Sequence, residues 1–325
     1  MPSHIGENEH MTGELSEVVQ KIGKKGGASV YARAAAKALE LMAKELEGID
    51  SDEFLSRLEA YGSELIKSQP SMASLINAVE YILNPLRKLV RRGGELGACK
   101  RLVLERSSEF IKNSENAVNK IARFGANLIR DGDTILTHSY SSTVLQILRS
   151  VKKSGKHIEV IVTESRPKLE GRELASELLK EKIPITLIID AAVCTIMDRV
   201  NKVLVGADSI LADGSIINKV GTFPIALAAR LNNVPFIVAA EFSKFNPFSL
   251  EGKSMEIKMG EPKELIDQEI FKNSNLLKIW NPTFEVVPSD YITLFVTDLG
   301  VLPPQAAIVE FKSIIHGDFR QGSFR

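Results

Sequence analysis

Residues 133–142 read DTILTHSYSS, and the character of the chain changes within this stretch. A short apolar-rich run from Thr134 to Leu136 gives way at Thr137 to polar and hydroxyl-bearing positions. An apolar run that ends in this way is typical of a strand that delivers polar side chains to the edge of a buried sheet. His138 and Ser139 follow directly, which raises the question of whether this polar end performs chemistry.

Before this stretch the pattern is helical, with apolar residues that recur at spacings of three and four. The helical segments are residues 31–46, 51–66, 71–90 and 95–129. Ser51 or Asp52 is the expected cap of the second segment. The last segment indicates either one long helix or two helices that meet near Asn113 and Ser114. We therefore predict a helical N-terminal domain over residues 1–130.

After this stretch, short apolar runs alternate with helical ones. The apolar runs are residues 134–138, 157–163, 185–189, 202–205, 236–239 and 292–296, and the helical runs are 144–151, 172–180, 191–197, 224–231 and 304–315. Strands that alternate with helices form right-handed crossovers and a parallel sheet. We predict an α/β fold in which the helical domain is followed by a Rossmann-like, mostly parallel-sheet domain with a ligand cleft, over residues 131–325. Residues 245–275 are expected to form a long surface excursion.

A polar cluster follows each apolar run of the second domain. The clusters are residues 137–139, 163–166, 190, 206–209, 240–241 and 297–298. The carboxyl ends of parallel strands meet at one edge of a sheet, and ligands bind in the crevice there, so we expect the clusters to converge on one cleft. Two alternatives stay open: the acidic members cap the following helices, Asp190 above all, or they bind Mg²⁺.

Two enzyme classes are disfavoured by missing motifs. A hydrolase of the Gly-x-Ser-x-Gly type needs glycines on both sides of its nucleophile, but Thr137 and Ser141 occupy those positions around Ser139. No Gly-x-Gly-x-x-Gly stretch is present, which disfavours a dinucleotide enzyme.

Composition narrows the class of protein further. The 41 Lys and Arg residues balance 41 Asp and Glu residues, so we expect no direct nucleic-acid or membrane partner. The only cysteines, Cys99 and Cys194, argue against a disulfide framework, and Cys194 is expected in the core. No apolar run reaches the ~20 residues of a membrane span. The N-terminus is a polar arm without a signal core, which favours a cytoplasmic location.

Two short stretches are suited to binding an anion. Gly27, Ala28 and Ser29 lie at the start of a helical segment, where small residues allow backbone N–H groups to approach a phosphate. A flexible helix start is the alternative for this stretch. Asn218 and Lys219 supply an amide and a cation ahead of another helical segment.

Seven of these landmarks together resemble a known family. They are THSYS at 137–141, VTESRP at 162–167, DAA at 190–192, GAD at 206–208, NKVGT at 218–222, FSKF at 242–245 and TDLGVLP at 297–303. In this order they resemble the alpha, beta and delta regulatory subunits of translation initiation factor 2B. The resemblance covers residues 100–315 and implies a homodimer formed through the C-terminal domain.

The same superfamily contains sugar-phosphate isomerases that act on methylthioribose 1-phosphate and on ribose 1,5-bisphosphate. The resemblance implies that these enzymes use a cysteine after the Thr-His pair and the aspartate of the Gly-Ala-Asp motif. Asp208 is therefore the catalytic residue expected if the chain is active, but Ser139 stands at the cysteine position. The chain also has Ser29 where the isomerases have a glycine, and Gln69 where they have an arginine.

A hydroxyl is a poor substitute for the cysteine, because a serine is several pKa units less acidic than a thiol of pKa ~8.5. We therefore predict an alpha-like regulatory subunit, a homodimer or higher oligomer without efficient catalysis that associates with initiation factor 2 or sibling subunits. Its expected ligand is a phosphorylated sugar or nucleotide, bound without cofactor or metal. The expected ligand-binding residues are Gly27, Ala28, Ser29, His138, Ser139, Tyr140, Ser141, Glu164, Arg166, Asp208, Asn218 and Lys219. The alternative is an aldose–ketose isomerase of the ribose 1,5-bisphosphate type that uses Asp208.

Overall fold

The structure is a computed structural model that describes residues 27–252, 257–266 and 276–321. The predicted polar arm at the N-terminus lies outside these residues. None of the helices in the described part of the chain combines the length and the apolar character needed to cross a membrane.

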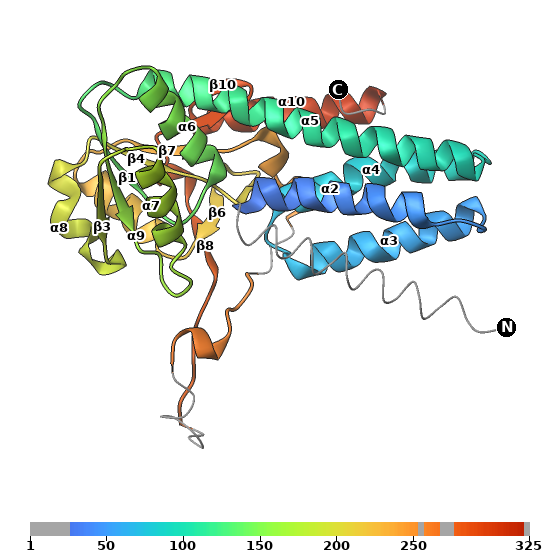
Figure 1. The fold of residues 1–325 in the computed structure, drawn as a ribbon, viewed down its shortest axis with the longest axis horizontal. Helices are drawn as coiled ribbons and strands as arrows, with labels where there is room; N and C mark the ends of the chain where they lie inside the picture. The colour runs from blue at the N-terminus through green and yellow to red at the C-terminus, as the bar shows by residue number, and fades with distance from the viewer. Residues whose placement is uncertain (1–26, 253–256, 267–275, 322–325) are drawn as a thin grey trace.

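Four helices form a layer at one end of the molecule (Figure 1). They are α2 (Gly27–Glu45), α3 (Ser51–Ser68), α4 (Ala73–Arg91) and α5 (Leu96–Leu128). Their apolar faces bury large side chains such as Tyr31, Phe54 and Tyr61 in one core. The cap of α3 is Asp50 and not the predicted Ser51 or Asp52, because the Asp50 carboxylate accepts the Glu53 N–H at 2.8 Å.

A single helix, α5, connects this layer to the rest of the protein (Figure 1). Its first half packs Val103 and Phe110 into the core of the helical layer. Its second half packs Ile121 and Ala126 against the sheet that follows. The long segment is therefore one helix, whose two halves serve two cores.

The remaining chain forms an α/β unit around a seven-stranded sheet. Its elements are β1 (Thr134–Thr137), α6 (Ser142–Lys153), β2 (Glu159–Thr163), α7 (Glu170–Lys180), β3 (Ile185–Ile188), α8 (Val193–Ile196), β4 (Lys202–Val205), α9 (Thr222–Leu231), β7 (Phe236–Ala239), β9 (Leu294–Thr297), β10 (Gly300–Leu302) and α10 (Pro304–Gln321). The strand order is β10-β9-β7-β4-β1-β2-β3, and every pair is parallel except β10 with β9. The predicted α/β fold with a mostly parallel sheet is therefore confirmed.

Helices cover both faces of this sheet, as its continuous apolar strands require. Successive side chains of β1 point to opposite faces, so Ile135 packs with α5, α6 and α7 while Leu136 packs with α8, α9 and α10. Short 3₁₀ turns connect several elements, at Asp190–Ala192, Met197–Arg199, Phe242–Lys244, Pro247–Glu251, Pro262–Glu264 and Ser289–Tyr291.

A second, antiparallel sheet was not predicted from the sequence. It consists of β5 (Ser209–Ile210), β6 (Ile216–Lys219) and β8 (Phe284–Val287), in the order β5-β6-β8. Two features make this sheet hard to predict from the sequence. Strand β5 has only two residues, and β8 pairs with a strand more than sixty residues earlier. This small sheet matters for function, because β6 carries Asn218 and Lys219.

Two further expectations are wrong. Cys194 is exposed and lies on α8, the four-residue helix between β3 and β4. The surface excursion begins later than predicted, since Phe245 is buried and stacks on Phe311 with ring centroids 4.5 Å apart. Residues 257–266 do extend away from the body of the molecule (Figure 1), and residues 267–275 lie outside the described part.

Candidate functional site

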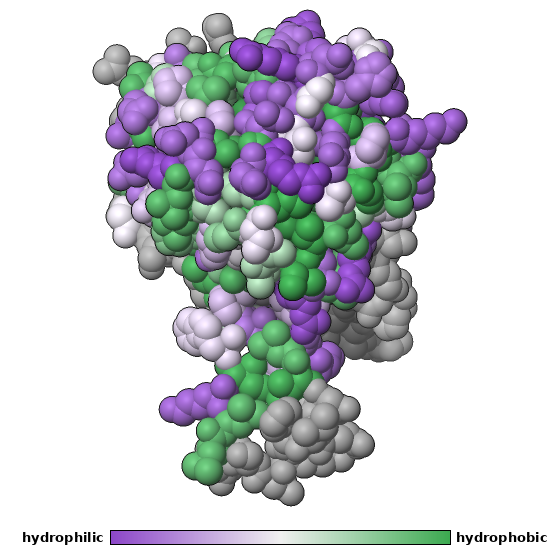
Figure 2. Space-filling model, turned by 90° about the vertical axis from the view of Figure 1, so that its left-hand side faces the viewer, coloured by the Kyte–Doolittle hydropathy of each residue, from purple (hydrophilic) through white to green (hydrophobic). Residues whose placement is uncertain are grey.

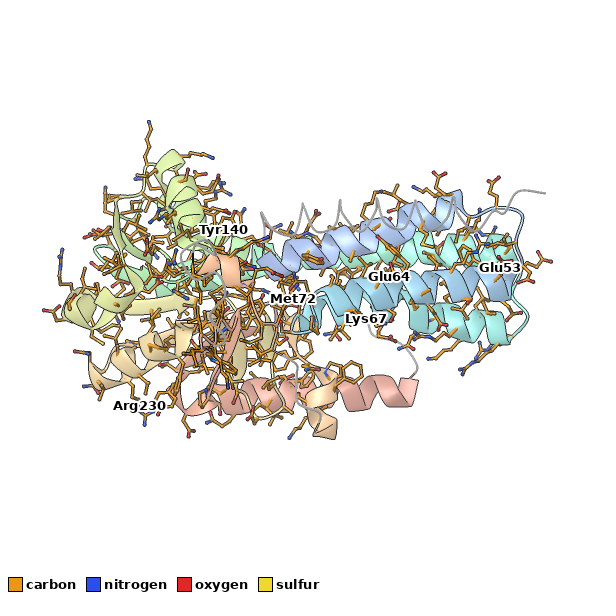
Figure 3. All side chains as sticks on the ribbon, turned by 90° about the horizontal axis from the view of Figure 1, so that it is seen from below. Glu53, Glu64, Lys67, Met72, Tyr140 and Arg230 are labelled. Carbon is orange, nitrogen blue, oxygen red and sulfur yellow. The ribbon has the colours of Figure 1, made fainter. Side chains whose placement is uncertain are left out.

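A pocket lies where the strand order of the large sheet reverses. After β1 the chain moves outward to β2 and β3, and then returns to β4 on the other side of β1. Ligands of open α/β sheets bind outside the carboxyl ends of the strands at such a point. The pocket is lined by Gly27, Ala28, Ser139, Tyr140, Ser141, Ser142, Gly206, Ala207, Asp208, Asn218 and Lys244. Figure 3 shows Tyr140 at the junction of the helical layer and the sheet.

The first residues of two helices line this pocket. Gly27 opens α2, and Ser142 opens α6. Gly27 has a φ of +73°, and a Cβ on it would lie 3.4 Å from the Tyr140 carbonyl oxygen, so the start of α2 packs closely on the loop after β1. Unpaired N–H groups and the helix dipole make a helix N-terminus attractive to anions. Two such ends at one pocket are well suited to phosphate groups.

Ser139 lies in the loop after β1 in a left-handed conformation, with a φ of 62°. Its N–H donates to the Ser165 Oγ at 2.7 Å, which fixes the loop to the end of β2. Among the described residues, none accepts a hydrogen bond from the Ser139 hydroxyl. No base therefore activates this serine as a nucleophile.

His138 lies behind the pocket and does not line it. Its Nδ1 is 2.6 Å from the Thr163 Oγ1, and its Nε2 is 2.9 Å from the Val220 carbonyl oxygen. Because a carbonyl oxygen only accepts, Nε2 carries the proton and Nδ1 accepts from the threonine hydroxyl. Burial lowers the pKa of His138, so the neutral ring is favoured. His138 therefore serves as a buried link between β1, β2 and the loop after β6.

Asp208 follows β4 and presents a half-buried carboxyl group to the pocket. Desolvation raises its pKa, and nearby Glu170 adds to this effect. The cations Lys244 and Lys219 act in the opposite direction but do not cancel it. Asp208 is therefore held closer to the protonated form than an ordinary aspartate, as a general acid requires.

Asn218 and Lys219 leave the buried strand β6 in different directions. Asn218 lines the pocket, and its Nδ2 donates to the Thr222 Oγ1 at 3.0 Å. The Lys219 Nζ lies 2.7 Å from a Glu170 carboxylate oxygen and 5.2 Å from the centre of the Phe284 ring. Lys219 is thus a paired cation beside the site and not a wall of the pocket.

Three further predicted ligand-binding residues, besides His138 and Lys219, lie off the pocket. Ser29 is buried within α2. Glu164 pairs with Arg172 at 2.6 Å. Arg166 is exposed, and its backbone N–H donates to Asp190 at 2.7 Å.

The predicted convergence of all six polar clusters is wrong in part. Only the clusters after β1 and β4 reach the pocket, because these strands flank the reversal of strand order. Asp190 does not cap its own helical turn: its carboxylate accepts the N–H of Ser165 and of Arg166, and so supports the loop after β2. After β9, Asp298 accepts the Phe242 N–H at 2.8 Å.

The sequence reasoning missed Lys244 as a site residue. It lies in the 3₁₀ turn after β7, is 4% exposed and lines the pocket beside Asp208. Lys244 belongs to the FSKF motif, which follows an apolar strand. A lysine in that position indicates a polar side chain at the edge of the sheet where ligands bind. In the described part of the chain, His, Cys, Asp and Glu side chains form no group of three or more that could bind a metal ion.

Comparison with known proteins identifies the family. Residues 24–304 match the initiation factor 2 subunit family. The chain is 37% identical over 298 residues to a ribose 1,5-bisphosphate isomerase from Thermococcus kodakarensis, which covers 91% of this chain and 92% of that protein. Six curated relatives with this name are 34% to 39% identical.

Solved structures agree in fold. A translation initiation factor eIF-2B from Pyrococcus horikoshii aligns with a TM-score of 0.78 and 34% identity, over 91% of this chain and 98% of that one. A 5-methylthioribose 1-phosphate isomerase from the same organism aligns with a TM-score of 0.74 and 27% identity, over 93% and 88%. A tetrameric eIF2B-beta2-delta2 complex from C. thermophilum, at 20% identity, shares the fold with a TM-score of 0.69 over 96% and 95%.

The prediction of a regulatory subunit without efficient catalysis is wrong. The six relatives named as isomerases favour the alternative, an aldose–ketose isomerase. That prediction relied on the absence of a cysteine at Ser139 and did not consider the buried Lys244 in the same pocket. From residue 24 to residue 304, the chain belongs to the initiation factor 2 subunit family.

Proposed function

We propose that this protein is an aldose–ketose isomerase that acts on ribose 1,5-bisphosphate. The observation that carries the proposal is the position of Asp208, a carboxyl group of raised pKa that shares one pocket with the first residues of α2 and α6. The names of the six curated relatives support the same choice of substrate.

The pocket suits a substrate with phosphate groups. The α2 and α6 N-termini offer backbone N–H groups, Asn218 offers an amide, and Lys244 offers a nitrogen. A bisphosphate carries four negative charges when fully ionised, and helix N-termini stabilise such groups without a metal. In our proposal these groups position the sugar so that its ring oxygen faces Asp208.

The reaction needs two proton deliveries and two proton removals. In an aldose 1-phosphate the carbonyl is masked in the ring, so the bond between C1 and the ring oxygen breaks and that oxygen takes a proton. C2 then loses a proton, C1 gains one, and the C2 hydroxyl loses its proton as it becomes the ketone. We assign the first delivery to Asp208, because its raised pKa favours the protonated carboxyl group, which can donate to the ring oxygen.

Turnover of the purified protein tests this function. We expect ketose formation from ribose 1,5-bisphosphate at about 1 to 10³ per second, the ordinary range for enzymes. Methylthioribose 1-phosphate lacks the second phosphate, and we expect slower turnover of this substrate. Both reactions are followed by a colorimetric ketose assay or by NMR. The proposed function would be rejected if the protein converted neither of the two sugar phosphates.

We also propose that the protein is a homodimer that uses the face around β3. Parallel strands are normally covered on both sides, yet every residue of β3 is at least partly exposed. Leu187 and Ile189 are 46% and 60% exposed, and Leu179 of the neighbouring α7 is 59% exposed. Figure 2 views this end of the molecule and shows apolar side chains gathered between charged ones. An apolar face of this kind marks an interaction surface.

The substitution Ile189→Lys should disrupt the dimer. An ammonium group buried without a partner costs several kcal/mol, so the dissociation constant should rise about a hundredfold or more. Size exclusion with light scattering at micromolar protein measures the change. Leu41→Lys, at a 39% exposed position of α2, is the matched control and should leave the dimer intact. A dimer that persists in Ile189→Lys would place the interface elsewhere.

A further inference from the structure

Lys244 is a buried amine in the pocket, and the described residues provide no counterion for it. It is 4% exposed, and in the described part of the chain no residue forms an ion pair or a hydrogen bond with its Nζ. Lys219, the other lysine near the site, is tied to Glu170 at 2.7 Å. Buried lysines are nearly always paired, because an ammonium group without a partner is costly to bury. The two lysines therefore differ in their surroundings: Lys219 has a carboxylate partner, and Lys244 has none among the described residues.

Burial and the charged groups around Lys244 act on its pKa in opposite directions. Burial lowers the pKa of Lys244, and Arg33 of α2 adds to the effect. Glu241 and Asp208 act in the opposite direction without restoring the ordinary value. One carboxylate oxygen of Glu241, Oε2, accepts a 2.7 Å hydrogen bond from Ser114, whose oxygen accepts one from Arg33 at 2.9 Å. The other oxygen, Oε1, is buried and has no hydrogen-bond partner among the described residues.

The other candidate bases near the pocket are less suited to accept a proton from the substrate. Both ring nitrogens of His138 are hydrogen-bonded, to Thr163 and to the Val220 carbonyl oxygen. Ser139 has no activating partner among the described residues and is far too weak an acid to be ionised unaided. Glu241 is 1% exposed and does not line the pocket. Tyr140 lines the pocket as well, but burial raises the pKa of its phenol, which makes it a poorer base. Among the described lining residues, Lys244 and Asp208 are the other groups whose pKa values are shifted.

We propose that Lys244 is the catalytic base of the isomerisation, in place of the cysteine that the resemblance implies for related isomerases. This assignment rests on the proposed function. The neutral amine takes the proton from C2 as the C1–C2 double bond forms, and it becomes an ammonium group. The same ammonium returns a proton to C1 while the C2 hydroxyl loses its proton to water. The Asp208 carboxylate regains a proton from that water, so the acid and the amine are both restored and atoms balance. Asp208 and Lys244 thus divide acid and base roles within one pocket.

Paired substitutions separate a base from a cation that only binds phosphate. Lys244→Arg keeps the positive charge but cannot lose its proton, and Lys244→Gln removes the charge. A base role predicts that both variants lose at least about a hundredfold in kcat, with KM nearly unchanged in the arginine variant. A binding role predicts that Lys244→Arg stays within about tenfold of wild type. This second result would overturn the assignment, and thermal unfolding of each variant establishes that it is folded.

Isotope transfer in the wild-type enzyme supplies a test that needs no substitution. A lysine that takes deuterium from C2 holds it among three equivalent N–H positions, so at most about one third can return to C1 in ordinary water. A thiol or carboxyl base holds a single proton and has no such limit. NMR of the ketose measures the deuterium at C1 after the reaction of substrate labelled at C2. Retention clearly above one third would overturn the assignment to Lys244.

The two proposals fail in different ways. If the wild-type protein turns over neither sugar phosphate, the isomerase function itself is rejected. If the wild-type protein is active and Lys244→Arg retains its kcat, the isomerase function stands and only the role of Lys244 is rejected.

Discussion

The substitution Asp208→Asn should lower kcat for ribose 1,5-bisphosphate by about a thousandfold, with little change in KM. Asparagine has nearly the shape of aspartic acid, so the pocket keeps its form. It cannot donate a proton to the ring oxygen, and positioned acids contribute about 10² to 10⁴ in rate. Steady-state ketose formation by both proteins measures the effect.

The pH dependence of the wild-type enzyme gives a second view of the same group. Asp208 must be protonated to act as an acid, and its raised pKa keeps it protonated to a higher pH than an ordinary aspartate. Activity should therefore decline as pH rises through that pKa, and the decline should be absent in Asp208→Asn. Asp52→Asn, on the exposed surface of α3, is the control and should match wild type. An Asp208→Asn variant with wild-type kcat would remove Asp208 from the mechanism.

The substitution Gly171→Ala should destabilise the fold by about 3 kcal/mol or more. A Cβ on Gly171 would lie 1.8 Å from the carbonyl oxygen of Thr163, so backbone atoms of α7 or β2 would have to move. The consequence reaches the pocket, because Thr163 and Ser165 hold His138 and Ser139 in place. Urea denaturation followed by circular dichroism measures the loss.

Gly97→Ala is a closely matched control for this prediction. Gly97 is the second residue of α5, as Gly171 is of α7. The nearest atom to an added Cβ at Gly97 is the Arg101 guanidinium at 3.7 Å, which is an ordinary contact. Alanine favours a helix over glycine by about 0.5 to 1 kcal/mol, so this variant should be as stable as wild type or more so. Equal stability of the two alanine variants would contradict the prediction for Gly171.

Much of the fold was readable from local pattern. The helical segments, the alternation of strands and helices, and the polar residues after β1 and β4 all follow from neighbours in the chain. The predicted residues Gly27, Ala28, Asp208 and Asn218 do line one pocket. Whether they bind a ligand remains a prediction, which the experiments above address.

The features that were missed depend on pairing across long stretches of chain. Strand β8 becomes a strand only because β6 lies beside it. Asp190 looked like a helix cap because a cap bonds to its own neighbours in the chain. Its actual partners, Ser165 and Arg166, lie in the loop after β2, more than twenty residues earlier. Cys194 looked buried because its neighbours are apolar, but Val193 and Met197 are buried while Cys194 itself is exposed.

By itself, the sequence determined the class of fold and the polar groups available at the ends of the strands, because periodicity and strand length are local properties. Only the tertiary structure decided which of those groups share a pocket and which carry a counterion. Ser139 and Lys244 are 105 residues apart, and nothing local distinguishes Lys244 from Lys219. Packing pairs Lys219 with Glu170 and leaves Lys244 buried beside Asp208, and burial without a counterion is what turns an ordinary lysine into a group that can accept a proton.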